Sequence, residues 1–325
     1  MRLFALRGSQ LLASAIAKAI GIELDPLEER DFEDGEHKTR PLISVRGEDV
    51  YVVHSLQGDG AESANDKLCK LLFFVAACRE HGAARVTAVV PYLAYSRKDR
   101  QTKTRDPVTT RYIAQLFEAV GTETVVVLDV HNVAAFQNAF RCRTVHLDTR
   151  NLFVEAMRSY AGDGPVTVFS PDGGGVKRAQ LLKEAFEEAT GRPVGFGFME
   201  KRRSAGVVSG SLFAGDVDGA AVFIVDDMIS TGGTMLRAAE ACRSRGATAV
   251  YVMAAHGLFA EGAGELLQSE AVSRTIVTDS VAPFRLSADT IAAHADVLQS
   301  GPLFGEAIMR LHGNGSISLL LERKS

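Results

Sequence analysis

Closely spaced cysteines are missing from this 325-residue sequence. Its four cysteines, Cys69, Cys78, Cys142 and Cys242, lie far apart and form no CxxC pair. Zinc sites and disulfide frameworks depend on patterned cysteine spacing, so neither is expected. We therefore predict a protein of the reducing cytoplasm.

Long apolar runs and an excess of basic residues are missing as well. Lys18 interrupts the apolar N-terminal segment, and no later stretch is apolar over the roughly 18 residues that a membrane span needs. Neither membrane insertion nor secretion is predicted. The formal net charge is −4 and the isoelectric point is about 6.1. Because nucleic-acid binding normally requires a cationic surface, nucleic acid is not expected as a partner.

Short apolar and β-branched runs alternate with longer amphipathic segments. Helical patterns are clearest over residues 66–80, 109–120 and 234–245. The runs expected to be strands are Val50–Val53, Val86–Val90, Thr124–Leu128, Val166–Phe169, Val222–Val225, Ala249–Ala254 and Thr275–Val277. Apolar strands separated by helices indicate parallel sheets covered on both faces, which is an α/β fold.

The length of the chain favours two domains, each large enough for its own core. Hydrophobic residues make up 46% of the sequence and charged residues 23%, as in ordinary globular proteins. One set of strands and helices closes near Asp148 and another opens near Asn151. We predict an N-terminal domain over residues 1–149 and a C-terminal domain over residues 150–299, with segment 300–325 joining the first.

A phosphate-binding turn is the clearest local signal. The apolar run that begins at Val222 ends in Asp226 and Asp227, and a turn follows that contains Ser230, Thr231, Gly232, Gly233 and Thr234. Backbone N–H groups at a helix start favour a phosphate, and glycine allows its close approach. The two carboxylates suit ribose hydroxyls or a magnesium ion instead. An ordinary capped helix after a strand is the structural alternative.

A second stretch, residues 89–108, gathers cations after a predicted strand. They are Arg97, Lys98, Arg100, Lys103 and Arg105. Such donors neutralise a polyphosphate through charge-assisted hydrogen bonds. A solvated charged loop is the alternative.

Two other predicted strands also end in polar side chains, at Asp129 and His131 and at Asp172. Ligands of open α/β sheets collect at the carboxyl ends of the strands. A lone histidine is more often structural, so the pattern alone leaves His131 open. Residues 200–210 form a cationic, glycine-containing segment between two apparent strands, which predicts a mobile lid or, alternatively, an exposed basic hairpin.

Together these motifs resemble those of the ribose-phosphate pyrophosphokinase family, from Leu3 to about Leu321. The resemblance implies two tandem phosphoribosyltransferase-like domains, each a mainly parallel sheet flanked by helices. It also implies an enzyme that moves the pyrophosphoryl group of ATP to the 1-hydroxyl of ribose 5-phosphate, giving phosphoribosyl pyrophosphate and AMP. Mg²⁺ is the implied cofactor, and a dimer-based homo-oligomer, with a hexamer as the larger form, is the implied assembly.

The same resemblance implies a role for each motif. ATP would be bound by Phe32, Asp34 and Glu36, acting on a neighbouring subunit, and by Arg97, Lys98 and Asp99. Ribose 5-phosphate would be bound by Asp226, Asp227, Ser230, Thr231, Gly232, Gly233 and Thr234. The metal would be held by His131 and Asp172, and the catalytic cations would be Lys201 and Arg203.

Two other functions remain open at this stage. A non-catalytic relative that regulates a true synthetase would keep the fold, and Lys98, Thr102 and Ser230 depart from the commoner family pattern. A phosphoribosyltransferase would explain the turn after Asp226, but it would need neither the cation-rich loop nor Lys201.

Overall fold

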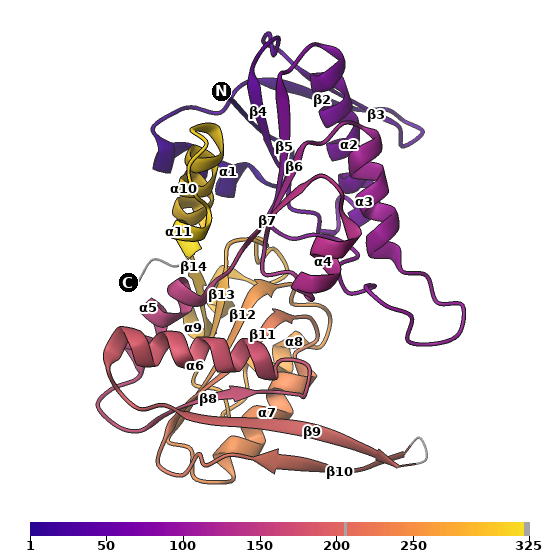
Figure 1. Ribbon diagram of the computed structural model, residues 1–325. Helices are drawn as coiled ribbons and strands as arrows, with labels where there is room; N and C mark the ends of the chain where they lie inside the picture. The colour runs from indigo at the N-terminus through magenta and orange to yellow at the C-terminus, as the bar shows by residue number, and fades with distance from the viewer. Residues whose placement is uncertain (205–206, 322–325) are drawn as a thin grey trace. The chain divides into compact units, whose positions relative to one another are not determined.

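A computed structural model describes residues 1–204 and 207–321, with the side chains of residues 201–211 outside the description. The chain divides into two compact units (Figure 1). Unit 1 comprises Met1–Asp148 and the segment that begins at Gln299, and unit 2 comprises Thr149–Leu298.

Unit 1 is built on a five-stranded parallel sheet in the order β1-β4-β5-β6-β7. The strands are β1 (Arg2–Ala5), β4 (Asp49–Val53), β5 (Arg85–Val90), β6 (Thr124–Leu128) and β7 (Arg143–Leu147). One face packs against α2 (Ala64–Glu80), α3 (Thr109–Ala119) and α4 (Val133–Ala139). The other face packs against α1 (Gln10–Ile20), α10 (Gly301–His312) and α11 (Ser318–Leu321). Alternate residues of each strand therefore feed two separate cores, as expected for a sheet buried on both faces.

The C-terminal helix α10 returns to unit 1 because two glycines let it approach α1 closely. A Cβ atom on Gly301 would lie 2.7 Å from the Cβ of Ala15, and one on Gly305 would lie 3.0 Å from Cγ2 of Ile20. Contacts that short leave no room for a side chain. The final segment thus closes the face of the sheet that α1 alone leaves partly uncovered.

Unit 2 holds a seven-stranded sheet in the order β10-β9-β8-β11-β12-β13-β14. Its strands are β8 (Val166–Ser170), β9 (Gly195–Ser204), β10 (Val207–Ala214), β11 (Ala221–Ile229), β12 (Ala249–Gly257), β13 (Arg274–Thr278) and β14 (Ala295–Leu298). All neighbours are parallel except β9 and β10. Helices α5 (Arg150–Tyr160) and α6 (Val176–Thr190) cover one face, and α7 (Gly233–Arg243) and α8 (Ala263–Leu267) cover the other. Helix α9 (Ala288–His294) leads directly into β14.

The predicted α/β class is confirmed, with strands that the apolar runs did not indicate. Two of them, β2 (Leu27–Asp31) and β3 (His37–Pro41), form a separate antiparallel hairpin in unit 1. In the segment predicted as a lid or a basic hairpin, residues 200–204 belong to β9 and residues 207–210 to β10. β9 pairs with β8 only from Gly195 to Phe198, and its remainder pairs with β10. Within the described residues, no helix combines the length and apolar character needed to cross a membrane.

Candidate functional site

The neighbouring acids Asp226 and Asp227 of unit 2 lie inside β11. The sequence had suggested that they follow the strand. On one side β11 pairs with β8 only through Ile224, whereas on the other side its ladder with β12 continues to Ile229. Asp226 and Asp227 therefore stand beyond the last β8 partner while β12 still holds them extended. Strand pairing, which the local sequence does not reveal, explains the difference.

The two carboxyl groups influence each other strongly. The backbone N–H of Asp227 donates to Oδ1 of Asp226 at 2.8 Å. Burial, followed by the neighbouring Asp227 carboxylate, raises the pKa of Asp226 to about 7. Nη1 of Arg178, from α6, lies 3.6 Å from Asp226 Oδ1 and opposes that rise. Asp226 thus keeps its proton to a higher pH than an ordinary aspartate does.

A glycine turn after β8 brings Asp172 to the same edge of the sheet. Oδ1 of Asp172 accepts hydrogen bonds from the N–H groups of Gly174 at 2.8 Å and Gly175 at 3.1 Å. A Cβ atom on Gly175 would lie 2.7 Å from Oγ of Ser170 and 3.9 Å from Oδ1 of Asp226. The missing side chain lets the turn pack beside the paired acids. Both of these backbone hydrogen bonds are accepted by Oδ1 of Asp172 and not by Oδ2.

The turn before α7 has the geometry of a phosphate cradle. Gly232 is the N-cap of α7, with φ of +79°, and no side chain among the described residues caps this helix start. A Cβ atom on Gly232 would also lie 2.9 Å from the side chain of Leu266. Both the backbone angle and the lack of space require glycine. The unpaired N–H groups and the helix dipole favour an anion here.

A cation stands next to this helix start. Nη2 of Arg237 donates to Oγ1 of Thr234 at 3.2 Å, and Nη1 of Arg237 would lie 3.5 Å from a Cβ atom on Gly233. Thr231 is exposed, and Ser230 is partly buried with its carbonyl accepting from the N–H of Ala260.

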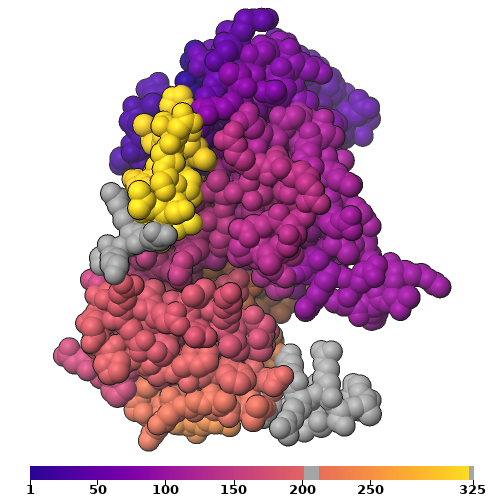
Figure 2. Space-filling view, viewed as in Figure 1, coloured from indigo at the N-terminus to yellow at the C-terminus, as the bar shows by residue number. Residues whose placement is uncertain are grey.

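In unit 1 the cation-rich loop lies between β5 and α3, and it stands out from the surface of the unit (Figure 2). Its five basic side chains, Arg97, Lys98, Arg100, Lys103 and Arg105, are exposed. Asp106 organises the loop: its Oδ2 accepts from the hydroxyl of Thr102 at 2.6 Å and from the N–H of Lys103 at 3.0 Å. The hydroxyl of Thr102, a departure from the commoner family pattern, therefore supports the shape of the loop.

The turn that carries His131 is tied to this loop. Asn132 caps α4 by accepting from the N–H of Ala135 at 3.1 Å, and its Nδ2 donates to Oδ2 of Asp99 at 2.7 Å. Asp129, at the end of β6, is buried with φ of +40°, and His131 is exposed. The structure thus joins the loops that follow β5 and β6 through an Asn132–Asp99 hydrogen bond that the sequence did not predict.

The remaining ATP-binding candidates lie in the turn of the β2–β3 hairpin. The N–H of Phe32 donates to the carbonyl of Glu36 at 2.8 Å, and Oδ1 of Asp34 accepts from the N–H of Glu36 at 3.1 Å. All three side chains are exposed, and the guanidinium of Arg30 lies 5.0 Å from the centre of the Phe32 ring. These backbone hydrogen bonds fix the shape of the turn while its three side chains stay exposed.

The structure gathers some of the predicted site residues and separates others. Asp172, Asp226 and Asp227 belong to unit 2, whereas His131 belongs to unit 1. Among the described residues no three His, Cys, Asp or Glu side chains are arranged to hold a metal ion. The backbones of Lys201 and Arg203 lie in β9, and their side chains fall outside the description. Arg178 was not assigned a role from sequence, although its place in the first turn of the helix after the glycines was a signal.

Two helix-covered, mainly parallel sheets, with acids at strand ends of both and glycine turns at strand ends of unit 2, define a tandem phosphoribosyltransferase-like α/β protein. Residues 1–121 match the N-terminal domain of ribose phosphate pyrophosphokinase, and residues 209–322 match the phosphoribosyl synthetase-associated domain. The chain belongs to the ribose-phosphate pyrophosphokinase family.

Individual relatives agree over the full length. Ribose-phosphate pyrophosphokinase 2 of Enterococcus faecalis is 34% identical over 327 residues, which cover 100% of this chain and 97% of the relative. The crystal structure of phosphoribosylpyrophosphate synthetase from Mycobacterium smegmatis superposes with a TM-score of 0.86 at 29% identity, covering 97% of this chain and 99% of that one. Both halves of the fold are therefore shared with this family.

Proposed function

We propose that this protein is a catalytically active ribose-phosphate pyrophosphokinase. The observation that carries the proposal lies within unit 2. There the neighbouring acids Asp226 and Asp227 of β11 are followed by the glycine start of α7, which has no side-chain cap among the described residues. Acids for sugar hydroxyls and N–H donors for a phosphate occur at one strand end, as a phosphorylated ribose requires. The exposed cations of residues 97–105 supply the second requirement, a surface for the triphosphate of ATP.

Each group contributes mainly by position and charge. The turn from Ser230 to Thr234 holds the 5-phosphate, and Asp226 and Asp227 hold the ribose hydroxyls. The 1-hydroxyl then attacks the β-phosphorus of ATP, the bond to the bridging oxygen of the α-phosphate breaks, and AMP leaves. Phosphoryl-type transfers of this kind depend on positioning and on neutralising charge in the transition state, the role we assign to Lys201 and Arg203.

Magnesium is the cofactor we propose, and the carboxylates of unit 2 fit it. Mg²⁺ prefers oxygen ligands and is commonly held by one or two carboxylates together with substrate phosphates. The ion would arrive with ATP, so that phosphate oxygens supply the rest of its ligands. Asp172 is the best protein ligand, because its Oδ1 is fixed by Gly174 and Gly175. The ion would neutralise the triphosphate, and His131 would orient its phosphates or water.

The binding of adenine involves Phe32, Asp34 and Glu36, and we propose that they serve a neighbouring copy in a homo-oligomer built from dimers. In that neighbouring copy, Arg97, Lys98 and Asp99 of its own cation-rich loop would hold the rest of the same nucleotide. Light scattering coupled to size exclusion checks the assembly: a monomer at working concentration would contradict it.

The decisive experiment measures AMP release from ATP with ribose 5-phosphate and Mg²⁺. The wild type is expected to release AMP, and Lys201→Ala should lower the turnover by about 10²-fold or more while ATP still binds. Lys183→Ala, which removes a partly exposed ion pair within α6, is the matched control and should keep full activity. A wild type that binds ATP but releases no AMP would sink the proposal and favour a regulatory relative. Nucleotide formed from a free base and phosphoribosyl pyrophosphate would reveal a phosphoribosyltransferase.

A further inference from the structure

The β2–β3 hairpin, which carries Phe32, Asp34 and Glu36, has no place in the five-stranded sheet of unit 1. Its two strands pair only with each other, from Leu27–Pro41 to Asp31–His37. An isolated two-stranded hairpin is marginally stable in water. Contacts with other elements must therefore determine where its turn lies.

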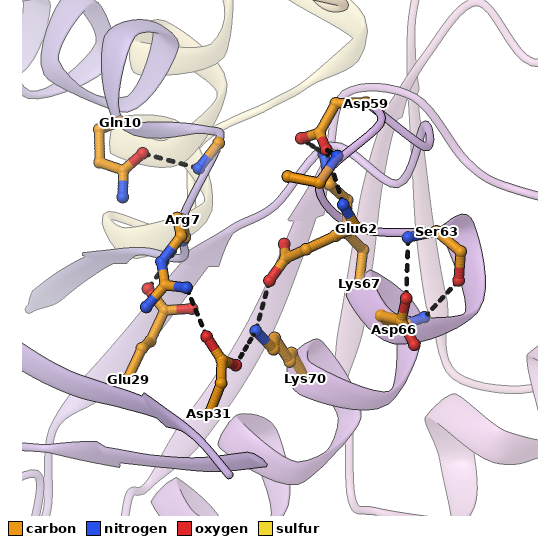
Figure 3. Close-up of polar contacts among 12 residues, drawn as sticks. Arg7, Gln10, Glu29, Asp31, Asp59, Glu62, Ser63, Asp66, Lys67 and Lys70 are labelled. Carbon is orange, nitrogen blue, oxygen red and sulfur yellow. Dashed lines mark hydrogen bonds and ion pairs between the residues drawn. The ribbon is translucent and has the colours of Figure 1, made fainter. Parts of the chain in front are cut away.

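Asp31, the residue just before Phe32, makes two of these contacts. Its Oδ1 accepts from Nζ of Lys70, on α2, at 2.6 Å, and its Oδ2 accepts from Nη1 of Arg7, in the β1–α1 turn, at 2.6 Å (Figure 3). The hydrogen bond from Lys70, followed by that from Arg7, lowers the pKa of Asp31. Each carboxylate oxygen is thus bound by a cation from a different element.

Lys70 is held in place from its other side. Its side chain is only 5% exposed, and its Nζ also binds Oε1 of Glu62. Removing one partner of such a buried ion pair lowers the free energy of unfolding more than removing a surface ion pair does. Lys70 is therefore a fixed anchor and not a mobile surface charge.

The loop that supplies Glu62 has its own support. Oδ1 of Asp59 accepts from the N–H of Glu62 at 2.9 Å, and Oδ2 of Asp59 lies 2.7 Å from Nζ of the fully buried Lys67 (Figure 3). α2 begins directly afterwards, with Ser63 and Asp66 forming a reciprocal capping box. The anchor at Lys70 consequently rests on a rigid helix start.

Two further contacts complete the seat of the hairpin. The His37 ring stacks on the Phe73 ring of α2, with centroids 5.3 Å apart, and Oε2 of Glu29 accepts from the N–H of Arg7 at 2.8 Å. Lys70 and Phe73 are three residues apart on α2, so they lie on one face of that helix. The paired residues Asp31 and His37 are thereby held at the base of the turn.

We propose that Lys70 and Arg7, acting through Asp31, are positioning residues for the nucleotide. By holding the base of the turn, they fix where Phe32, Asp34 and Glu36 meet an adenine ring. The inference rests on the proposed function, since it assigns the turn to ATP. It predicts that disturbing Asp31 weakens ATP binding and leaves ribose 5-phosphate binding unchanged.

The test compares Asp31→Asn, Lys70→Met and the double variant. Each single change should raise KM for ATP roughly tenfold, which corresponds to one charge-assisted hydrogen bond, with kcat and KM for ribose 5-phosphate within about twofold of the wild type. The double variant should be little worse than Lys70→Met alone, because both changes break the same contact. Arg40→Met is the control: it removes the exposed Glu28–Arg40 pair from the same hairpin and should leave all constants unchanged.

Several outcomes would overturn the proposal. They are an unchanged KM for ATP in both single variants, a parallel rise in KM for both substrates, or an equal effect of Arg40→Met. Calorimetric titration with ATP measures the same weakening without turnover. A wild type that binds ATP but releases no AMP would contradict the proposed function and not the role of Lys70. That role is still decided by the titration, which needs no turnover. Asp31→Asn keeps the proposal testable if Lys70→Met fails to fold, because the Asp31 side chain is 46% exposed and the change is isosteric.

Discussion

Nη1 of Arg178 lies 3.6 Å from Oδ1 of Asp226, which ties the first turn of α6 to the acidic end of β11. The contact joins the Asp172 glycine turn to the paired acids, because α6 begins directly after that turn. It supplies one positive charge against two neighbouring carboxyl groups. Burial, followed by the neighbouring Asp227 carboxylate, outweighs this cation and raises the pKa of Asp226 to about 7.

The raised pKa of Asp226 predicts a pH-dependent effect of Asp226→Asn on stability. The unfolded carboxyl ionises near pH 3.9, whereas the folded one ionises near pH 7, so ionised Asp226 costs the folded state free energy that grows across this interval and is full above pH 7. Asp226→Asn should therefore stabilise the protein more at pH 8 than at pH 5, by on the order of 2 kcal/mol. Urea unfolding at both pH values measures this. The exposed Asp163→Asn should show no such difference, and a pH-independent effect of Asp226→Asn would refute the assignment.

Gly232→Ala should damage the phosphate turn and the stability of the fold together. The change adds left-handed backbone strain at φ +79° and a contact of 2.9 Å with Leu266, so we expect a loss of about 2–4 kcal/mol and weaker ribose 5-phosphate binding. Gly262 is the matched control, because it has φ of +94° with no atom within 4 Å of an added Cβ. Gly262→Ala should cost about 1 kcal/mol and leave binding intact. Equal losses in the two variants, measured by chemical denaturation, would show that Leu266 contributes nothing.

Asn132 performs two tasks that substitution can separate. Asn132→Ser keeps an oxygen for the N–H of Ala135, yet its side chain is too short to keep the bond to Asp99. We expect a melting temperature close to that of the wild type with a KM for ATP several times higher. Asn132→Ala should lower both stability and affinity, since the cap is lost too, by about 1 kcal/mol. An unchanged KM in Asn132→Ser would mean that the link to Asp99 does not shape the cation-rich loop.

Lys67→Met tests the buried ion pair under the α2 start. The Lys67 side chain is 0% exposed and its partner Asp59 is 20% exposed, so removing the cation leaves a mostly buried carboxylate without its charge partner. The expected loss is about 3 kcal/mol. Arg143→Met, which breaks a pair whose arginine is 65% exposed, should cost under about 1 kcal/mol. Guanidinium unfolding of the two variants is the measurement, and similar losses would contradict the difference in burial.

Much of the fold could be predicted because its strands are short apolar runs between amphipathic helices. The strand over Thr124–Leu128 was predicted at its observed bounds, and the other predicted strands all start within one residue of their observed start. The β2–β3 hairpin could not be predicted in this way, because its strands are largely polar and gain their stability from Lys70, Arg7 and Phe73. The extension of β11 through Asp226 was missed because it depends on pairing with β12.

The sequence by itself determined the class of fold, the family and the places where phosphate-binding chemistry concentrates. Residue type and spacing suffice there, because glycine turns and paired acids act locally. Only the tertiary structure decided that Arg178 meets Asp226, that Asn132 meets Asp99 and that Lys70 meets Asp31. Those contacts join residues 33 to 48 positions apart in the sequence. Such pairs form only when the strands and helices pack.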